Sequence, residues 1–198
     1  MNGKIIIGLD LSASEKKPTG WAKIENRTLK TAQLYTDKEI IEATIKYAPI
    51  LVAIDAPLTF PKKKIMRKAD RQMYKLGYPV FPPLFKTMQK LTERGVKISE
   101  ILRIRNLEVI EVHPASSRKA LSMPTKDWRK IQAVFKHIGL RGEHERRMLT
   151  RHEIDAATAA LTGWLHLQGK TMLVGEPTEG CIVVPVKSDW RKIRFEFK

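Results

Sequence analysis

Four carboxylic acids stand at the ends of regular segments, where they could do chemistry. Asp10 and Asp55 each follow an apolar run typical of a strand buried on both faces. If these strands are parallel neighbours, their carboxyl ends lie about 4.8 Å apart. Two carboxylates at that distance repel each other and raise each other's pKa, and a divalent cation between them removes the conflict. Hard oxygen ligands of this kind favour Mg²⁺ or Mn²⁺.

Two further acids fit the same edge of the sheet. Glu111 lies near the end of a short predicted strand at 108–112, and Asp155 lies one turn inside a predicted helix. Asp155 is about 100° around the helix from Ile154, at the border of the apolar stripe, so it can reach over the sheet edge. The four acids together therefore predict one metal-binding cluster.

Each acid also has an ordinary structural alternative. Asp10 or Asp55 alone is more often a turn former or a helix cap, and Glu111 alone could be a surface strand residue. Asp155 alone could simply favour the dipole at a helix N-terminus. Glu153 is best explained by helix capping, so it is left out of the cluster. The metal interpretation depends on the combination.

The histidines and the cysteine give weaker signals. His113 and His152 are next to the acidic positions in the chain and could orient water or phosphate, and a local structural role is an equal alternative. The five histidines have no metal-finger spacing, and one cysteine, Cys181, excludes a thiolate zinc site. A single cysteine also suits a reducing cytoplasm, which is the expected location.

Hydrophobic patterning and capping signals predict the elements that position these residues. Three strands close in sequence predict an antiparallel meander, and later strands joined by helices predict parallel pairing. We therefore expect an α/β fold of RNase H-like type, with a mixed five-stranded sheet flanked by helices in a single domain spanning 1–198. The predicted strands are 5–9, 20–24, 28–34, 51–54 and 108–112, with two late strands at 171–174 and 181–186, and the predicted helices are 36–48, 127–138 and 150–167.

The segment 57–106 interrupts this alternation and carries most of the excess positive charge. The whole chain has 37 Lys and Arg against 21 Asp and Glu, a formal net charge of +16. Thirteen of the basic residues and three of the acids fall within 57–106, so this quarter of the chain contributes +10. We interpret it as a mostly helical basic insertion. Localised charge of this kind favours a polyanionic partner over a merely solvated surface.

Nothing in the sequence suggests a membrane protein. No stretch reaches the ~20 apolar residues of a membrane span. The N-terminus runs directly into a predicted strand, with no room for a signal peptide. No partner other than nucleic acid is indicated, and the oligomeric state is not predicted.

Several short motifs, taken in order, resemble a family of predicted nucleases with an RNase H fold, a family that is itself largely of unknown function. The resemblance runs from about Gly8 to Pro185, and the order and spacing of the motifs are more distinctive than any one of them. The motifs are Gly8-Leu9-Asp10-Leu11-Ser12, Thr19-Gly20-Trp21-Ala22, Ile54-Asp55-Ala56-Pro57-Leu58, Arg67-Lys68-Ala69-Asp70-Arg71, Glu111-Val112-His113-Pro114 and His152-Glu153-Ile154-Asp155-Ala156-Ala157, followed by Gly175-Glu176, Gly180 and Pro185.

The resemblance implies a metal-dependent nuclease that hydrolyses phosphodiester bonds by a two-metal mechanism. Asp10, Asp55, Glu111 and Asp155 would then be both the catalytic residues and the metal ligands. One ion, held chiefly by Asp10 and Asp155, would activate water. The second, held by Asp10 and Asp55, would stabilise the leaving oxygen, and Glu111 would support either ion.

The resemblance also suggests residues that bind the substrate. Arg67, Asp70 and Arg71 match a further family motif, and we expect the arginines to hold a phosphate while Asp70 orients one of them. An ordinary ion pair on a helix surface is the competing explanation. Lys63 and Lys64, with the other cations of 57–106, are expected to bind the backbone of DNA or RNA without reading its sequence.

Two other classes of function fit parts of the sequence. A nucleic-acid-binding protein without turnover would explain the basic segment and leave the acidic cluster unexplained. An ATP-dependent phosphotransferase of the related actin-like fold would explain the strand and loop at 8–20, although the chain is short for it and has no lysine-bearing phosphate loop.

Overall fold

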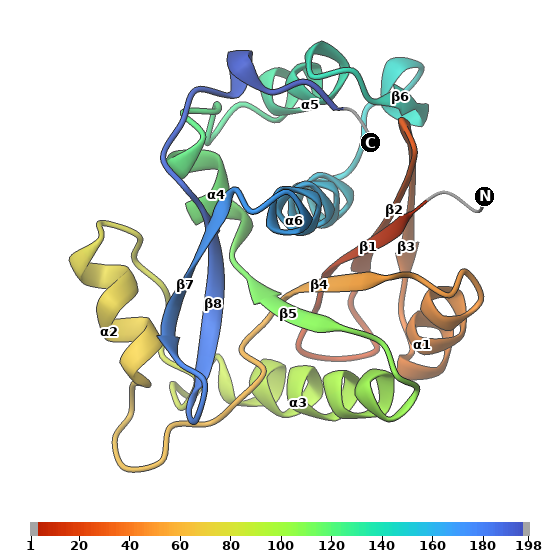
Figure 1. Ribbon diagram of the computed structural model, residues 1–198. Coiled ribbons are helices and arrows are strands. Elements are labelled where there is room, and N and C mark those ends of the chain that lie inside the picture. The colour runs from red at the N-terminus through yellow and green to blue at the C-terminus, as the bar shows by residue number, and fades with distance from the viewer. Residues whose placement is uncertain (1–3, 196–198) are drawn as a thin grey trace.

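The centre of the computed structural model, which describes residues 4–195, is one mixed sheet of eight strands (Figure 1). The order across the sheet is β6-β3-β2-β1-β4-β5-β8-β7. The strands are β1 Ile5–Asp10, β2 Thr19–Glu25, β3 Thr28–Leu34, β4 Leu51–Asp55, β5 Val109–Val112, β6 Arg141–Gly142, β7 Thr171–Glu176 and β8 Gly180–Pro185.

The strand directions agree with the expected mixed sheet. β1, β2 and β3 pair antiparallel, and β4, β5 and β8 continue from β1 in parallel. The prediction of five strands is wrong, because β8 pairs with β5, β7 pairs with β8, and the short β6 pairs with β3. The β5–β8 and β3–β6 pairings join segments far apart in the chain, so no local pattern reveals that the late strands and β6 belong to the same sheet.

Helices cover both faces of the sheet. In Figure 1, α6 crosses one face, while α1 and α3 lie against the other and α2 lies beside β7. The α-helices are α1 Asp37–Ile45, α2 Lys68–Lys75, α3 Gln89–Ile104, α4 Pro114–Ala120, α5 Trp128–His137 and α6 Arg151–Leu167, with short 3₁₀ turns at Glu143–Glu145 and Trp190–Lys192. No helix within residues 4–195 is long and apolar enough to cross a membrane.

Capping residues begin the two helices where the sequence predicts them. Thr36 and Glu39 form a capping box at the start of α1, and Thr150 and Glu153 form another at the start of α6. The sequence analysis missed α4, which begins with Pro114 at its first position, where a missing N–H costs nothing.

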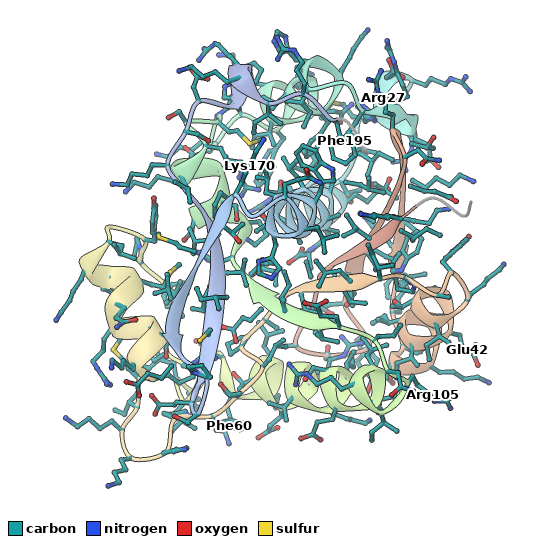
Figure 2. All side chains as sticks on the ribbon, in the orientation of Figure 1. Arg27, Glu42, Phe60, Arg105, Lys170 and Phe195 are labelled. Atoms are coloured by element: carbon teal, nitrogen blue, oxygen red, sulfur yellow. The ribbon has the colours of Figure 1, made fainter. Side chains whose placement is uncertain are left out.

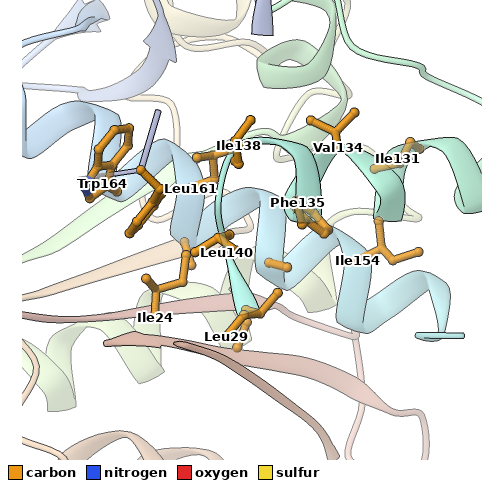
Figure 3. Close-up of a cluster of buried hydrophobic side chains, with 14 of the residues drawn as sticks. Ile24, Leu29, Ile131, Val134, Phe135, Ile138, Leu140, Ile154, Leu161 and Trp164 are labelled. Atoms are coloured by element: carbon orange, nitrogen blue, oxygen red, sulfur yellow. The ribbon is translucent and has the colours of Figure 1, made fainter. Parts of the chain in front are cut away.

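The larger core lies between α6, α5 and the sheet. Figure 3 shows its buried side chains, with Ile24 and Leu29 of the sheet below Leu161 and Trp164 of α6. Trp164 also stacks on Phe195, with ring centroids 4.3 Å apart, so the end of the described chain closes this core.

On the opposite face, α3 is a structural part of the sheet and not an appendage. Ile98 and Leu102 of α3 are fully buried against Val52 and Ile54 of β4. The helix therefore serves as the crossover between β4 and β5. Helices α2 and α3 account for 24 of the 50 residues in 57–106, about half of the segment and not most of it.

Most charged residues of the basic segment lie at the outer surface, and Arg67, Asp70 and Arg94 are buried. Figure 2 shows Arg105, at the end of α3, and Glu42, on α1, pointing away from the layers. Charged side chains are seldom buried, and three that are, Arg67, Asp70 and Glu111, lie together near the sheet edge that contains Asp10 and Asp55.

Candidate active site

Asp10 and Asp55 end neighbouring strands at the same level of the sheet. β1 and β4 run parallel, and Asp10 is directly opposite Asp55 in their register. Asp10 accepts a hydrogen bond from His152, while the Asp55 carboxylate has no hydrogen-bond or ion-pair partner among residues 4–195. The sequence prediction that these two acids stand side by side is confirmed by the register.

Two glycines let α6 approach this edge closely. A Cβ on Gly8 would lie 2.0 Å from the backbone oxygen of Ala156, and one on Gly20 would lie 1.9 Å from the backbone oxygen of His152. Any larger residue would therefore push the helix away from β1 and β2. The close packing brings Asp155 and His152, both in the first turns of α6, to the end of β1.

Asp10 and Asp155 are each paired with a basic side chain. His152 Nδ1 lies 2.6 Å from Asp10 Oδ2, and Arg118 of α4 forms an ion pair with Asp155. The hydrogen bond that His152 donates to Asp10 raises the pKa of His152, which favours the protonated ring. Asp10 and Asp155 are therefore oriented before any ligand arrives.

Asp55 is the acid with least compensation. Burial, followed by repulsion from Asp10 and Asp155, raises the pKa of Asp55 well above 3.8. Burial also raises the pKa of Asp10, although the His152 hydrogen bond opposes it. This is the electrostatic conflict that a bound cation relieves.

Glu111 differs from the expectation that it joins the metal ligands. Its carboxylate accepts hydrogen bonds from Arg67 Nη1 and Nη2 at 2.7 and 2.6 Å, and from the backbone N–H of Leu58 at 2.8 Å. Only 6% of its side chain is exposed. Its oxygens are thus already taken up by donors from the protein.

Arg67 lines the same cavity as Asp10 and Asp55, but acceptors of the protein already take up its donors. Its side chain is 1% exposed, and its guanidinium also donates to Asp70 at 2.8 Å and to Thr59 Oγ1 at 3.0 Å. Burial opposes the charge, but Glu111 and Asp70 outweigh it and raise the pKa of Arg67. Asp70 orients Arg67 as expected, but it orients it toward Glu111. The motif reads as a buried ion-pair network.

Lys63, Lys64 and Arg71 gather elsewhere. They line a separate surface cavity together with Glu176 and Glu179. Arg71 donates to the backbone oxygen of Met66 at 2.7 Å. This basic surface is near α2 and does not share a cavity with Asp10 or Asp55, so its role in substrate binding stays a prediction.

His113 is a neutral residue of the site. Burial, with repulsion from Arg118, lowers the pKa of His113 to about 4, and Nδ1 lies 2.7 Å from Ser116 Oγ. The ring lines the cavities on both sides of Asp55. It can donate or accept one hydrogen bond there, but it does not add positive charge near neutral pH.

Two hollows flank the carboxylates and differ in chemistry. One contains Asp10, Asp55 and Glu111 and is walled by apolar side chains that include Phe81. The other contains Asp55 and Asp155 and is lined by the cations Arg118, Lys126 and Arg151, with Trp128.

The sequence patterns did not indicate the cations of the second hollow or Trp128 as site residues. Trp128 is half-buried and packs on the edge of the larger core. The His113-Pro114 pair is the feature of the sequence that could have indicated Arg118. A proline after a strand often begins a helix, and Arg118 lies one turn further along that helix.

The acids fit a divalent cation in kind. Asp55 is a partly buried carboxylate without a partner among residues 4–195, it stands beside Asp10, and the two with Asp155 repel each other. Among residues 4–195, no group of three or more His, Cys, Asp and Glu side chains is already arranged around one point.

Comparisons with known proteins give a family and a distant structural likeness. A family model described as "Protein of unknown function (DUF429)" matches residues 8–179. No curated protein matches. The structure is similar to Thermus thermophilus RuvC in complex with a Holliday junction substrate, at 13% identity and a TM-score of 0.46, covering 84% of this chain and 96% of that one. It is also similar to a second T. thermophilus RuvC structure, at 15% identity and a TM-score of 0.41, covering 83% and 96%.

Proposed function

Because the chain belongs to the DUF429 family of proteins of unknown function, its activity has to be inferred from its own residues, and we propose that it is a metal-dependent nuclease. The observation that supports this best is the placement of Asp55. It is a partly buried carboxylate without a partner among residues 4–195, beside Asp10 and near Asp155, at the sheet edge. In open α/β sheets, ligands bind at the carboxyl ends of the strands.

The roles of the residues follow from their contacts. Asp10, Asp55 and Asp155 would hold the cation, which when bound supplies an activated water and stabilises the charge of the leaving oxygen. His152 fixes the orientation of the Asp10 carboxylate, and Arg118 fixes that of Asp155.

Glu111 has a different part in the proposal. Since Arg67 and the Leu58 backbone N–H occupy its oxygens, we assign it to the support of β5 beside β4 and not to the first ligands of the cation. The two-ion arrangement implied by the family resemblance stays a prediction.

Charge supports nucleic acid as the substrate. The chain carries a formal net charge of +16, and three cations line the hollow that contains Asp55 and Asp155. A polyanion neutralises this excess, and a phosphodiester brings the bond to be hydrolysed to the carboxylates. DNA and RNA both meet this description.

A cleavage assay tests the proposal. The purified chain is incubated with labelled single-stranded and duplex DNA and RNA, in Mg²⁺, Mn²⁺ or EDTA. We expect cleavage with either metal, none in EDTA, and a loss of at least about 100-fold in Asp55→Asn, because the variant keeps the shape of the side chain and removes the charge. Asp189→Asn, an exposed acid at a 3₁₀ turn, is the matched control and should cleave like the parent.

The outcomes separate the proposal from its rivals. Cleavage that persists in Asp55→Asn contradicts the assigned site. Salt-sensitive binding without cleavage in any metal favours a binding protein without turnover. Protection against unfolding by ATP, with no cleavage, favours the phosphotransferase alternative.

A further inference from the structure

We propose that Arg118 and Arg151, held over the ring of Trp128, form together with Lys126 a clamp for a backbone phosphate of nucleic acid, in the groove that also contains Asp55 and Asp155. This inference rests on the proposed function, since it says where the substrate of that site is held. It also moves the main phosphate contact away from the Lys63–Arg71 motif and onto α4, α5 and α6.

The clamp lines a groove of about 540 Å³ that reaches the carboxylates. Arg118 comes from α4, Trp128 from the start of α5, and Arg151 from the start of α6. Asp55 and Asp155 lie in the same groove. A phosphate bound by the arginines would therefore be next to the acids and not at a remote surface.

Arg118 has donors left over after its contacts with the protein. Its Nη1 donates to Asp155 and, at 3.3 Å, to Thr158 Oγ1. Its Nε is buried with no hydrogen-bond partner among the described residues, and Nη2 has none either. A guanidinium with one edge paired and the other without an acceptor suits a second oxyanion, because an arginine fork binds phosphate through two parallel hydrogen bonds.

Arg151 and Lys126 are exposed cations without acidic partners in the described part of the chain. The Arg151 guanidinium carbon lies 5.0 Å from the centre of the Trp128 ring, and that of Arg118 lies 5.5 Å from it. Stacking of this kind limits the rotamers of a long side chain, so less conformational entropy is lost when the ligand binds. Trp128 is thus a positioning residue for both arginines.

A phosphodiester fits this site better than a lone carboxylate does. Three cations surround the groove, while Asp155 and Asp55 carry negative charge at its inner end. A ligand must bring negative charge to the arginines and also have a bond to present to the acids. A nucleic-acid backbone, with successive phosphates along the chain, does both.

The first test measures binding without requiring cleavage. The affinity of a labelled single-stranded oligonucleotide is measured by fluorescence anisotropy in EDTA and in Ca²⁺, over a series of salt concentrations, for the parent and for Lys126→Gln/Arg151→Gln. We expect the double variant to bind at least about tenfold more weakly, with a salt slope lowered by about 2, since each lost phosphate contact lowers it by about 1.

The matched control removes two cations from other surfaces. Lys30→Gln/Lys170→Gln changes the net charge equally, on β3 and at the start of β7. A loss of affinity in this control as large as that in Lys126→Gln/Arg151→Gln would overturn the clamp, because binding would then follow net charge alone.

A second variant separates position from charge. Trp128→Leu keeps both arginines and removes the ring that holds them, so it should weaken binding several-fold with an unchanged salt slope. Trp128→Phe should restore part of the affinity. A Trp128→Leu protein that is folded by circular dichroism and binds like the parent would contradict the positioning role.

Failure of the clamp and failure of the nuclease proposal give different results. Metal-dependent cleavage with unchanged binding in Lys126→Gln/Arg151→Gln rejects the clamp and keeps the nuclease. Binding that depends on the clamp, with no cleavage by the parent, keeps the clamp and rejects the nuclease.

Discussion

Two buried arginines stand on either side of the carboxylates, and their surroundings differ. Arg67 is 1% exposed and is paired with two acids, Asp70 and Glu111. Arg118 is 4% exposed and is paired with one acid, Asp155, which is itself 21% exposed. The first arginine has its charge balanced and its donors used, while the second has a buried Nε without an acceptor.

The difference indicates which arginine the fold needs and which one a ligand can use. A buried charge must be paired where it stands, so Arg67, Asp70 and Glu111 depend on each other for stability. Arg118 lines an open groove, and its partner Asp155 is partly exposed. The two arginines are therefore buried to a similar degree, but Arg67 has a structural role and Arg118 remains available to bind a ligand.

Removing Arg67 should have the largest effect on stability. Arg67→Met leaves Asp70 and Glu111 buried without a cation, and we expect a loss of about 3–5 kcal/mol in the free energy of unfolding. Urea denaturation followed by circular dichroism measures it. A loss below about 1 kcal/mol would mean that the two acids take up protons at little cost, and the contrast with Arg118 would disappear.

Removing Arg118 should cost less. In Arg118→Met, Asp155 can be hydrated because part of its side chain is exposed, so we expect a loss of about 1–2 kcal/mol in the free energy of unfolding. The same denaturation experiment compares the two variants directly. If Arg118→Met is as damaging as Arg67→Met, Arg118 is a structural residue and the comparison fails.

Neutralising Asp55, which lies between the two arginines, should raise the free energy of unfolding, whereas removing either arginine should lower it. Its pKa is raised in the folded chain, so as the pH rises above 3.8 the unfolded chain gives up this proton first, and ionisation lowers the stability of the folded metal-free protein. Asp55→Asn should therefore be more stable than the parent near pH 7, by about 1–2 kcal/mol, and the difference should vanish near pH 4.

Thermal unfolding of both proteins in EDTA, between about pH 4 and 7, measures this difference. Saturating Mg²⁺ or Mn²⁺ should raise the unfolding temperature of the parent and leave that of Asp55→Asn almost unchanged. A parent that is already the more stable protein in EDTA at pH 7 would contradict the assignment of Asp55 as an uncompensated acid.

Much of the sheet could be predicted from the sequence, because the signals are local. Thr28–Leu34 has the predicted bounds, and Leu51–Asp55 differs from prediction only by including Asp55 itself. Apolar runs reveal buried strands wherever they pair, and the capping box of Thr150 and Glu153 reveals the start of α6. The positions of Asp10, Asp55 and Asp155 followed from these elements.

The partners of the acids could not be predicted, because the contacts are long-range. Arg67 meets Glu111 across 44 residues of sequence, and Arg118 meets Asp155 across 37. From the motif alone, Arg67 is as good a phosphate ligand as Arg118, and only burial between two acids distinguishes them. For the same reason, phosphate binding was predicted for the basic segment 57–106, although the cations of α4 and α6 were equally good candidates.

The glycines under α6 make the spacing of the acids a property of the backbone. Gly8 and Gly20 allow the helix to rest on β1 and β2, and a methyl group at either position would meet a main-chain oxygen at about half a normal contact distance. The helix would have to rise, and it would carry Asp155 away from Asp10. Mutational scans of this family should therefore show that substitutions of Gly8 and Gly20 are not tolerated, although neither residue has a functional group. Substitution at these two positions would alter the distance between the carboxylates without replacing any of the acids.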